Sequence, residues 1–196
     1  MARIAILGWG SLLWNPGNLK NERKWHSDGP WLPIEFARTS NLEEKKDRRP
    51  YLSLVIYAHA GLVRTYWDMS LLTEMADARL DLQKREGCSI DEIACLPKGT
   101  TAWSSATPGL EGRIQEWLDS HRSAVDAVIW TNLGWKFAGA SRFTAEDGMK
   151  WLRSLREARK HDTCEEYIRK APSQTDTCLR RQAREEFEWT DIPIGY

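Results

Sequence analysis

The chain has 196 residues, of which 41% are hydrophobic, and its 28 basic side chains balance 28 acidic ones. This length and composition suffice for one sizeable core, while the charge balance disfavours nucleic acid and anionic membranes as partners. We therefore expect a small neutral or zwitterionic molecule as the partner, with no nucleic acid and no membrane.

The first predicted element is a strand at residues 2–7, within the opening sequence Met-Ala-Arg-Ile-Ala-Ile-Leu-Gly. Its apolar run is too short for a signal peptide. No other stretch approaches the roughly 20 apolar residues that a helix needs to span a bilayer. The sequence therefore predicts a cytoplasmic protein.

A loop punctuated by glycines follows this strand, with the sequence Gly8-Trp9-Gly10-Ser11-Leu12-Leu13-Trp14-Asn15-Pro16-Gly17. Glycines at alternate positions allow a sharp turn and a close approach to a bound group, so the backbone N–H groups of the loop are candidate donors. Leu13 stands where both the dinucleotide fingerprint and the nucleophile elbow need a small residue. Ser11 is therefore not expected to be a nucleophile.

Four further strands are predicted at residues 34–40, 51–57, 62–67 and 125–131. Together with the first strand they are expected to form a single mixed sheet. Residues 87–107 are rich in Gly, Pro, Ser and Thr, so they are predicted to be irregular, either as a cover over a site or as a connection.

A helix is predicted at residues 71–86, with Ser70 as its N-cap and Gly87 as its C-terminal stop. Apolar residues at a/d spacing form a stripe that faces the core, namely Leu71, Met75, Ala78 and Leu82. Glu86 lies at the margin of this stripe, where the helix dipole and partial burial both raise the proton affinity of a carboxylate. Such a carboxyl group suits general acid/base catalysis near neutral pH.

Two alternatives to a catalytic Glu86 stay open at this point. Glu86 also fits a frayed surface position, where it pairs with a nearby lysine or arginine. Glu74, in the first turn of the same helix, is a backup carboxylate, although the helix dipole already accounts for an acidic residue there.

Helices are predicted for most of the remaining chain. Thr107 and Pro108 open a helix with one apolar face, namely Leu110, Ile114, Trp117 and Leu118. Capping-box patterns predict helix starts at Thr144 and Thr163, and a further helix covers residues 176–187.

One domain is the default for a chain of this length, so residues 1–196 are expected to fold as a single domain. Within it, residues 1–135 hold all the predicted strands and form the core. The helices of residues 136–196 form an extension packed on that core.

The cysteines and histidines do not predict a metal site. The cysteines show neither a Cys-x-x-Cys pair nor the paired spacing of a zinc site, and a cytosolic chain keeps them reduced; they are Cys88, Cys95, Cys164 and Cys178. His161 and Cys164 are spaced to share a helical face, but no second pair of ligands accompanies them. We expect neither a metal nor a cofactor.

The glycine loop resembles the Tyr-Gly-Ser-Asn/Leu loop of the gamma-glutamylcyclotransferase-like family, and the stretch Ser11–Gly17 is closest to the ChaC branch of that family. Trp9 stands where the family usually has tyrosine. The second hallmark of the family is a downstream glutamate near the end of a helix, and the segment Leu-Asp-Leu-Gln-Lys-Arg-Glu-Gly at residues 80–87 is similar to it. The resemblance covers roughly the first two thirds of the chain.

The resemblance implies an α/β fold of the α+β kind, in which a small mixed sheet forms a partly closed barrel around a cavity. In that family the glutamate takes a proton from the α-amino group of a γ-glutamyl substrate, and the amine attacks the γ-carbonyl to give 5-oxoproline. Carried over to this chain, Glu86 is the catalytic acid/base. The backbone of Trp9, Gly10, Ser11 and Leu12 binds the γ-glutamyl group, and no cofactor is needed.

The leaving group and the class of function have alternatives. The substrate is a γ-glutamyl amino acid, a γ-glutamylamine or a γ-glutamyl-protected natural product. Activity on glutathione stays open, because Trp9 replaces the tyrosine of the family. A second reading is a non-catalytic protein that binds a small metabolite or a partner and uses Glu86 only to hold an amine. A third is a hydrolase that uses Ser11 with a histidine, and it lacks an elbow motif.

Overall fold

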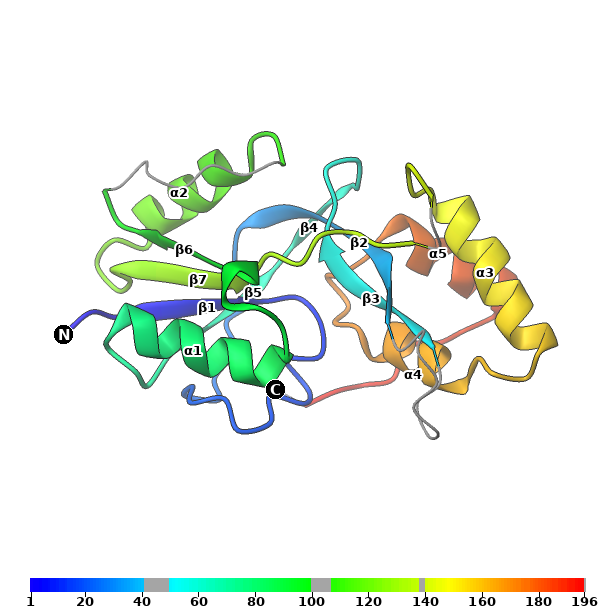
Figure 1. Cartoon of the computed structure of the whole chain (residues 1–196), viewed down its shortest axis with the longest axis horizontal. Helices are drawn as coiled ribbons and strands as arrows, with labels where there is room; N and C mark the ends of the chain where they lie inside the picture. The colour runs from blue at the N-terminus through cyan, green and yellow to red at the C-terminus, as the bar shows by residue number, and fades with distance from the viewer. Residues whose placement is uncertain (41–49, 100–106, 138–139, 196) are drawn as a thin grey trace. The chain divides into compact units, whose positions relative to one another are not determined.

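Figure 1 shows the computed structural model of the chain, which describes residues 1–40, 50–99, 107–137 and 140–195. Its contacts divide it into two compact units, each assembled from separate segments of the chain. Unit 1 comprises residues 1–32 and 64–133, and unit 2 comprises residues 33–63 and 134–195. The described residues form a mixed α+β architecture with two sheets and five α-helices.

The sheet of unit 1 has four strands in the order β5-β1-β7-β6. They are β1 (Ile4–Gly8), β5 (Tyr66–Met69), β6 (Ile93–Pro97) and β7 (Ala127–Thr131). The two central strands, β1 and β7, run parallel, while β5 and β6 pair antiparallel at the edges. Every residue of β1 and β7 is buried, which explains their continuous apolar sequences.

Helix α1 (Met75–Glu86) packs against β6 and β7, and a short 3-10 helix, η1 (Ile90–Glu92), lies beside it. Helix α2 (Leu110–Ser120) also belongs to unit 1. An apolar cluster in the core of this unit takes residues from the sheet, from α1 and from the segment after β1, namely Ile4, Ile6, Leu12, Leu13, Leu19, Tyr66, Ala78, Leu82, Ile93, Ala127 and Ile129.

Unit 2 is built on a three-stranded sheet in the order β3-β2-β4. Its strands are β2 (Trp31–Ser40), β3 (Tyr51–Ile56) and β4 (Leu62–Arg64). Its helices are α3 (Ala145–Glu157), α4 (Asp162–Lys170) and α5 (Cys178–Phe187). Helix α4 packs on β3, and α3 packs beside α5 (Figure 1).

The predicted single sheet is wrong, and neither of the two sheets closes into a barrel. The predicted strand at residues 62–67 is interrupted at Thr65, so that β4 joins one sheet and β5 the other. Thr65 instead pairs with the preceding loop, because its N–H donates to Pro30 O at 3.1 Å and its own carbonyl accepts from Gly29 N at 3.0 Å.

The prediction that residues 87–107 are irregular is also wrong in part. Strand β6 (Ile93–Pro97) lies in this stretch, directly after η1, and residues 100–106 lie outside the described part of the chain. The strand is a sheet edge and ends at a proline, which a central strand would not tolerate. Its apolar run is short and lies between polar and glycine-rich neighbours, so the sequence pattern indicates a strand only weakly.

Helix α1 begins later than predicted, at Met75, with Glu74 rather than Ser70 as its N-cap. Ser70 N donates to Ile4 O at 2.8 Å and Leu71 N donates to Lys20 O at 2.9 Å, so this stretch extends the strand pairing. Leu71, expected in the buried stripe, is therefore exposed. The end of the helix at Gly87 is confirmed, with a left-handed φ of 65°.

For the later helices, the predicted buried faces agree with the structure better than the predicted first and last residues do. All four residues of the predicted apolar face of α2 are buried, and the capping box of Thr144 and Asp147 starts α3. Helix α4 starts one position before Thr163, with His161 at its N-cap. Residues 33–63 group with the C-terminal segment in unit 2, and the division of one domain at residue 135 stays a prediction.

Arg180 is a charged residue of unit 2 whose side chain is fully buried. Its guanidinium donates hydrogen bonds to the carbonyl oxygens of Ala171, Pro172 and Thr175 and forms an ion pair with Asp191 at 3.0 Å. It therefore links three backbone carbonyls between α4 and α5, of which Pro172 O also accepts from Thr175 N at 2.8 Å.

Gly8, the last residue of β1, is required by packing. A Cβ at this position would lie 2.8 Å from the indole ring of Trp25 and 3.0 Å from Cδ1 of Leu13. Gly8→Ala is expected to lower the free energy of unfolding by about 1–3 kcal/mol, because the core must shift to admit the methyl group. Urea denaturation measures this loss. Gly112→Ala in α2, where the new Cβ meets nothing within 4 Å, should be neutral or stabilising.

Arg180→Met should destabilise the protein by about 1–3 kcal/mol, because it removes a buried donor to backbone carbonyl oxygens, while Asp191 keeps its pair with Arg184. The matched control is Arg181→Met, which removes an exposed guanidinium from the next position and should cost about 1 kcal/mol or less. Equal losses of stability in the two variants, measured by denaturant unfolding, would contradict this account of Arg180.

Candidate functional site

The glycine loop forms a single helical turn directly after β1. Leu13 N donates to Gly10 O at 3.0 Å, and Asn15 N donates to Ser11 O at 2.8 Å. We call residues 10–15 the glycine-loop turn. These two bonds do not use the N–H groups of Ser11 and Leu12, as expected for the first residues of any helical turn. The turn therefore presents backbone donors at its start.

The side chains of the predicted substrate-binding residues have different positions. Trp9 and Leu12 are both 6% exposed, and Leu12 belongs to the apolar core of unit 1. Ser11 is only partly buried, and Gly10 offers backbone alone. Trp9 and Leu12 thus hold the turn on the core, while its polar groups belong to the backbone and to the Ser11 hydroxyl.

Glu86 is the last residue of α1, as predicted, and its side chain is 15% exposed. Glu74 lies at the opposite end of the same helix, where it is exposed and makes no side-chain capping bond. Of the two candidate carboxylates, Glu86 alone is mostly removed from solvent.

Arg85 connects Glu86 to the glycine-loop turn. Its Nη1 donates to Glu86 Oε1 at 2.7 Å, while its Nη2 donates to Ser11 Oγ at 3.0 Å and to the carbonyl oxygen of Asn15 at 2.7 Å. The structure therefore brings the predicted carboxylate and the predicted loop together through one guanidinium. Sequence reasoning did not assign Arg85 to the site, although the apolar stripe of α1 ends beside it.

The electrostatics of Glu86 follow from this environment. Burial raises the pKa of the Glu86 carboxyl, and the charge and hydrogen bond of Arg85 partly oppose that shift. The predicted direction is confirmed, with burial as its cause. The pairing with a neighbouring arginine, which the surface alternative predicted, is also present, but the carboxylate is buried. Its second oxygen, Oε2, accepts no hydrogen bond from the described residues.

The other candidate groups do not join this site. Cys164 is buried in α4, and burial raises the pKa of its thiol to about 12, so it stays protonated and is a poor metal ligand. The described residues hold no group of three or more His, Cys, Asp or Glu side chains that could bind a metal ion. In the same part of the chain, no helix has the length and apolar character to cross a membrane.

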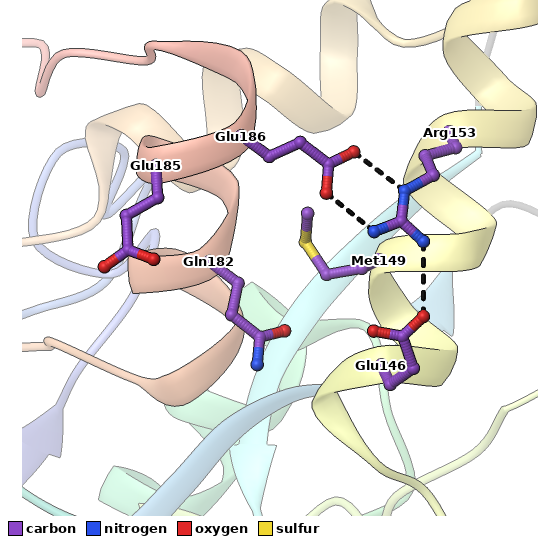
Figure 2. Close-up of a pocket in the computed structure, with 6 residues that line it drawn as sticks. All are labelled: Glu146, Met149, Arg153, Gln182, Glu185 and Glu186. Carbon is purple, nitrogen blue, oxygen red and sulfur yellow. Dashed lines mark hydrogen bonds and ion pairs between the residues drawn. The ribbon is translucent and has the colours of Figure 1, made fainter.

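A surface hollow of about 300 Å³ lies between α3 and α5 in unit 2, and Figure 2 shows its lining. Arg153 lies between the carboxylates of Glu186, at 2.7 and 2.6 Å, and of Glu146, at 3.3 Å. Of the pairs of Arg153 with these two exposed carboxylates, the one with Glu186 holds α3 beside α5. Neither a buried carboxyl nor a nucleophile lies in this hollow, so we do not assign the chemistry to it.

A mostly buried carboxylate, joined through Arg85 to a turn with unused backbone donors, can move a proton while the turn binds a carbonyl or carboxylate group. Comparison of the chain with family models, curated proteins and solved structures finds no match. The function is therefore argued from this geometry.

The raised pKa of Glu86 is directly measurable. Carbon-13 NMR of labelled glutamate carboxyls, assigned with Glu86→Gln, should give Glu86 a midpoint above the ordinary value of about 4.3. Because the folded state then binds more protons, the stability of the native protein relative to Glu86→Gln should fall as pH rises through that midpoint. A midpoint at or below the ordinary value would contradict the burial argument.

Proposed function

We propose that the chain is a gamma-glutamylcyclotransferase-like enzyme that releases 5-oxoproline and an amine from a small γ-glutamyl substrate. The observation that carries the proposal is the contact of Arg85 with both Glu86 and the glycine-loop turn. Through this contact the two motifs of the family resemblance lie at one place in unit 1, which supports a common role for them.

Glu86 is the general acid/base of the reaction. Its ionised carboxylate takes a proton from the α-amino group of the substrate as the amine nitrogen attacks the γ-carbonyl carbon. A new C–N bond closes the five-membered ring, and the C–N bond to the leaving amine breaks. The proton then passes from Glu86 to the leaving nitrogen, which restores the carboxylate. Because the attack is intramolecular, proximity supplies much of the acceleration.

The glycine-loop turn, with Trp9 before it, binds the γ-glutamyl group. The N–H groups of Ser11 and Leu12, which the turn does not use internally, donate to the oxygen that becomes negative as the ring closes. Burial of the Trp9 and Leu12 side chains supports a binding role for backbone atoms rather than for those side chains. This role also tolerates tryptophan at the position where the family has tyrosine.

The proposal rests on the site and not on the fold. The two sheets are open, so a barrel cavity is no part of the argument. A core in residues 1–135, an extension in residues 136–196 and a cytoplasmic location belong to the same proposal.

A non-catalytic protein that binds a small amine is the second candidate. The ion pair of Glu86 with Arg85 favours it, because a carboxylate held at 2.7 Å from a guanidinium also suits a purely binding role. The hydrolase reading loses support, because Ser11 Oγ accepts a hydrogen bond from Arg85. A nucleophilic serine instead needs a neighbouring base that takes its proton.

The test is release of 5-oxoproline, detected by mass spectrometry, from γ-glutamyl amino acids, γ-glutamylamines and glutathione. Glu86→Gln keeps the shape of the side chain and removes the base, so it should lower kcat by about 100-fold or more. Glu74→Gln is the matched control on the same helix and should leave kcat within about twofold of the native value, since an exposed side chain outside the site adds nothing to the barrier.

The other outcomes separate the alternatives. Substrate binding without 5-oxoproline would favour the binding protein, and free glutamate as the product would favour a hydrolase. Equal turnover by the native protein and Glu86→Gln would remove Glu86 from the mechanism.

A further inference from the structure

We propose that Arg85 is a positioning residue for Glu86: its guanidinium holds Oε1, so that Oε2 is the oxygen that exchanges protons with the substrate. This inference rests on the proposed function and adds one residue to it. Arg85 acts through Glu86 and does not itself need to touch the substrate.

The guanidinium joins the end of α1 to the turn after β1, two elements far apart in the sequence. Nη2 is fixed on the turn by Ser11 Oγ at 3.0 Å and Asn15 O at 2.7 Å, and Nη1 lies 2.7 Å from Glu86 Oε1. Only 12% of the Arg85 side chain is exposed. Because the guanidinium is planar and rigid, the two contacts on the turn also fix the place where Nη1 meets Glu86.

The two oxygens of Glu86 are therefore not equivalent. Oε1 accepts the hydrogen bond from Arg85, whereas Oε2 accepts none within the described ranges. An arginine remains protonated at any working pH and donates to a carbonyl-type oxygen as well as to a carboxylate oxygen. The Oε1 contact can thus persist while a proton arrives at and leaves Oε2.

The charge of Arg85 also keeps the carboxyl usable as a base. Burial raises the pKa of Glu86, and Arg85 lowers it, so the carboxylate is ionised at a lower pH than burial alone would allow. The glycine-loop turn has no titratable side chain. The titratable groups on the elements packed against α1 are Asp91 and Glu92 of η1 and Cys95 of β6, whereas the causes of the shift are burial and Arg85.

The test separates charge and position from stability. Arg85→Met removes both the positive charge and the planar guanidinium. Arg85→Lys keeps a positive charge but removes the planar arrangement of N–H donors. Lys84→Met is the matched control, because it removes an exposed positive charge from the adjacent position of α1. Ser11→Ala removes one contact of Arg85 with the turn and leaves the pair with Glu86. If Arg85→Met does not fold, Arg85→Gln replaces it.

Two readouts are made on each folded variant: the carbon-13 midpoint of Glu86, and kcat for 5-oxoproline release as a function of pH. Arg85→Met should raise the titration midpoint of Glu86 by about one pH unit. The acid limb of the pH profile of kcat should move to higher pH by the same amount. Arg85→Met should also lower kcat at the optimum by about 10- to 100-fold, with a smaller change in KM. Arg85→Lys should keep the midpoint and lower kcat.

A midpoint in Arg85→Met equal to that in Lys84→Met would overturn the proposal, as would an unchanged kcat and acid limb. A purely structural arginine would lower stability and move neither quantity. If the native protein releases no 5-oxoproline, the proposed function fails, while the midpoints still decide whether Arg85 controls Glu86.

Discussion

The contact on which this site depends is the guanidinium of Arg85, because it joins a helix end to a turn through three hydrogen bonds in a mostly buried place. A charged group removed from water needs a partner for each donor, and here the partners are a carboxylate, a hydroxyl and a carbonyl. The same contact keeps Glu86 ionisable despite its burial. Local packing and the chemistry of the carboxyl group therefore have one physical origin.

Local signals in the sequence predicted much of the fold. The continuous apolar runs of β1 and β7, the left-handed Gly87 and the capping box at Thr144 each act over a few residues, and each is confirmed. Strand partners depend on contacts between distant residues, which periodicity does not encode. For this reason the two sheets, the break at Thr65 and edge strand β6 were missed.

In the candidate site, too, the features set by local sequence were predicted and those set by contacts between distant residues were not. Glu86 and the glycine-loop turn were predicted from motif and helix position, and both lie where expected in their own elements. Arg85 was missed because its role comes from a tertiary contact with Ser11 and Asn15, and nothing in the local sequence specifies that contact. Gly8 was assigned to ligand approach, whereas the ring of Trp25 fills the space beside it.

The order of the strands has a consequence for synthesis of the chain on the ribosome. Parallel pairing of β1 with β7 joins Ile4 to Ala127, and the pairing of β1 with β5 encloses all of residues 33–63. Strand β1 must therefore wait for its central neighbour until residues Ala127–Thr131 have emerged. Closing so long a loop slows folding and leaves the edge of β1 that pairs with β7 unpaired in the meantime. The sheet of unit 1 is therefore complete only after β7 has been synthesised.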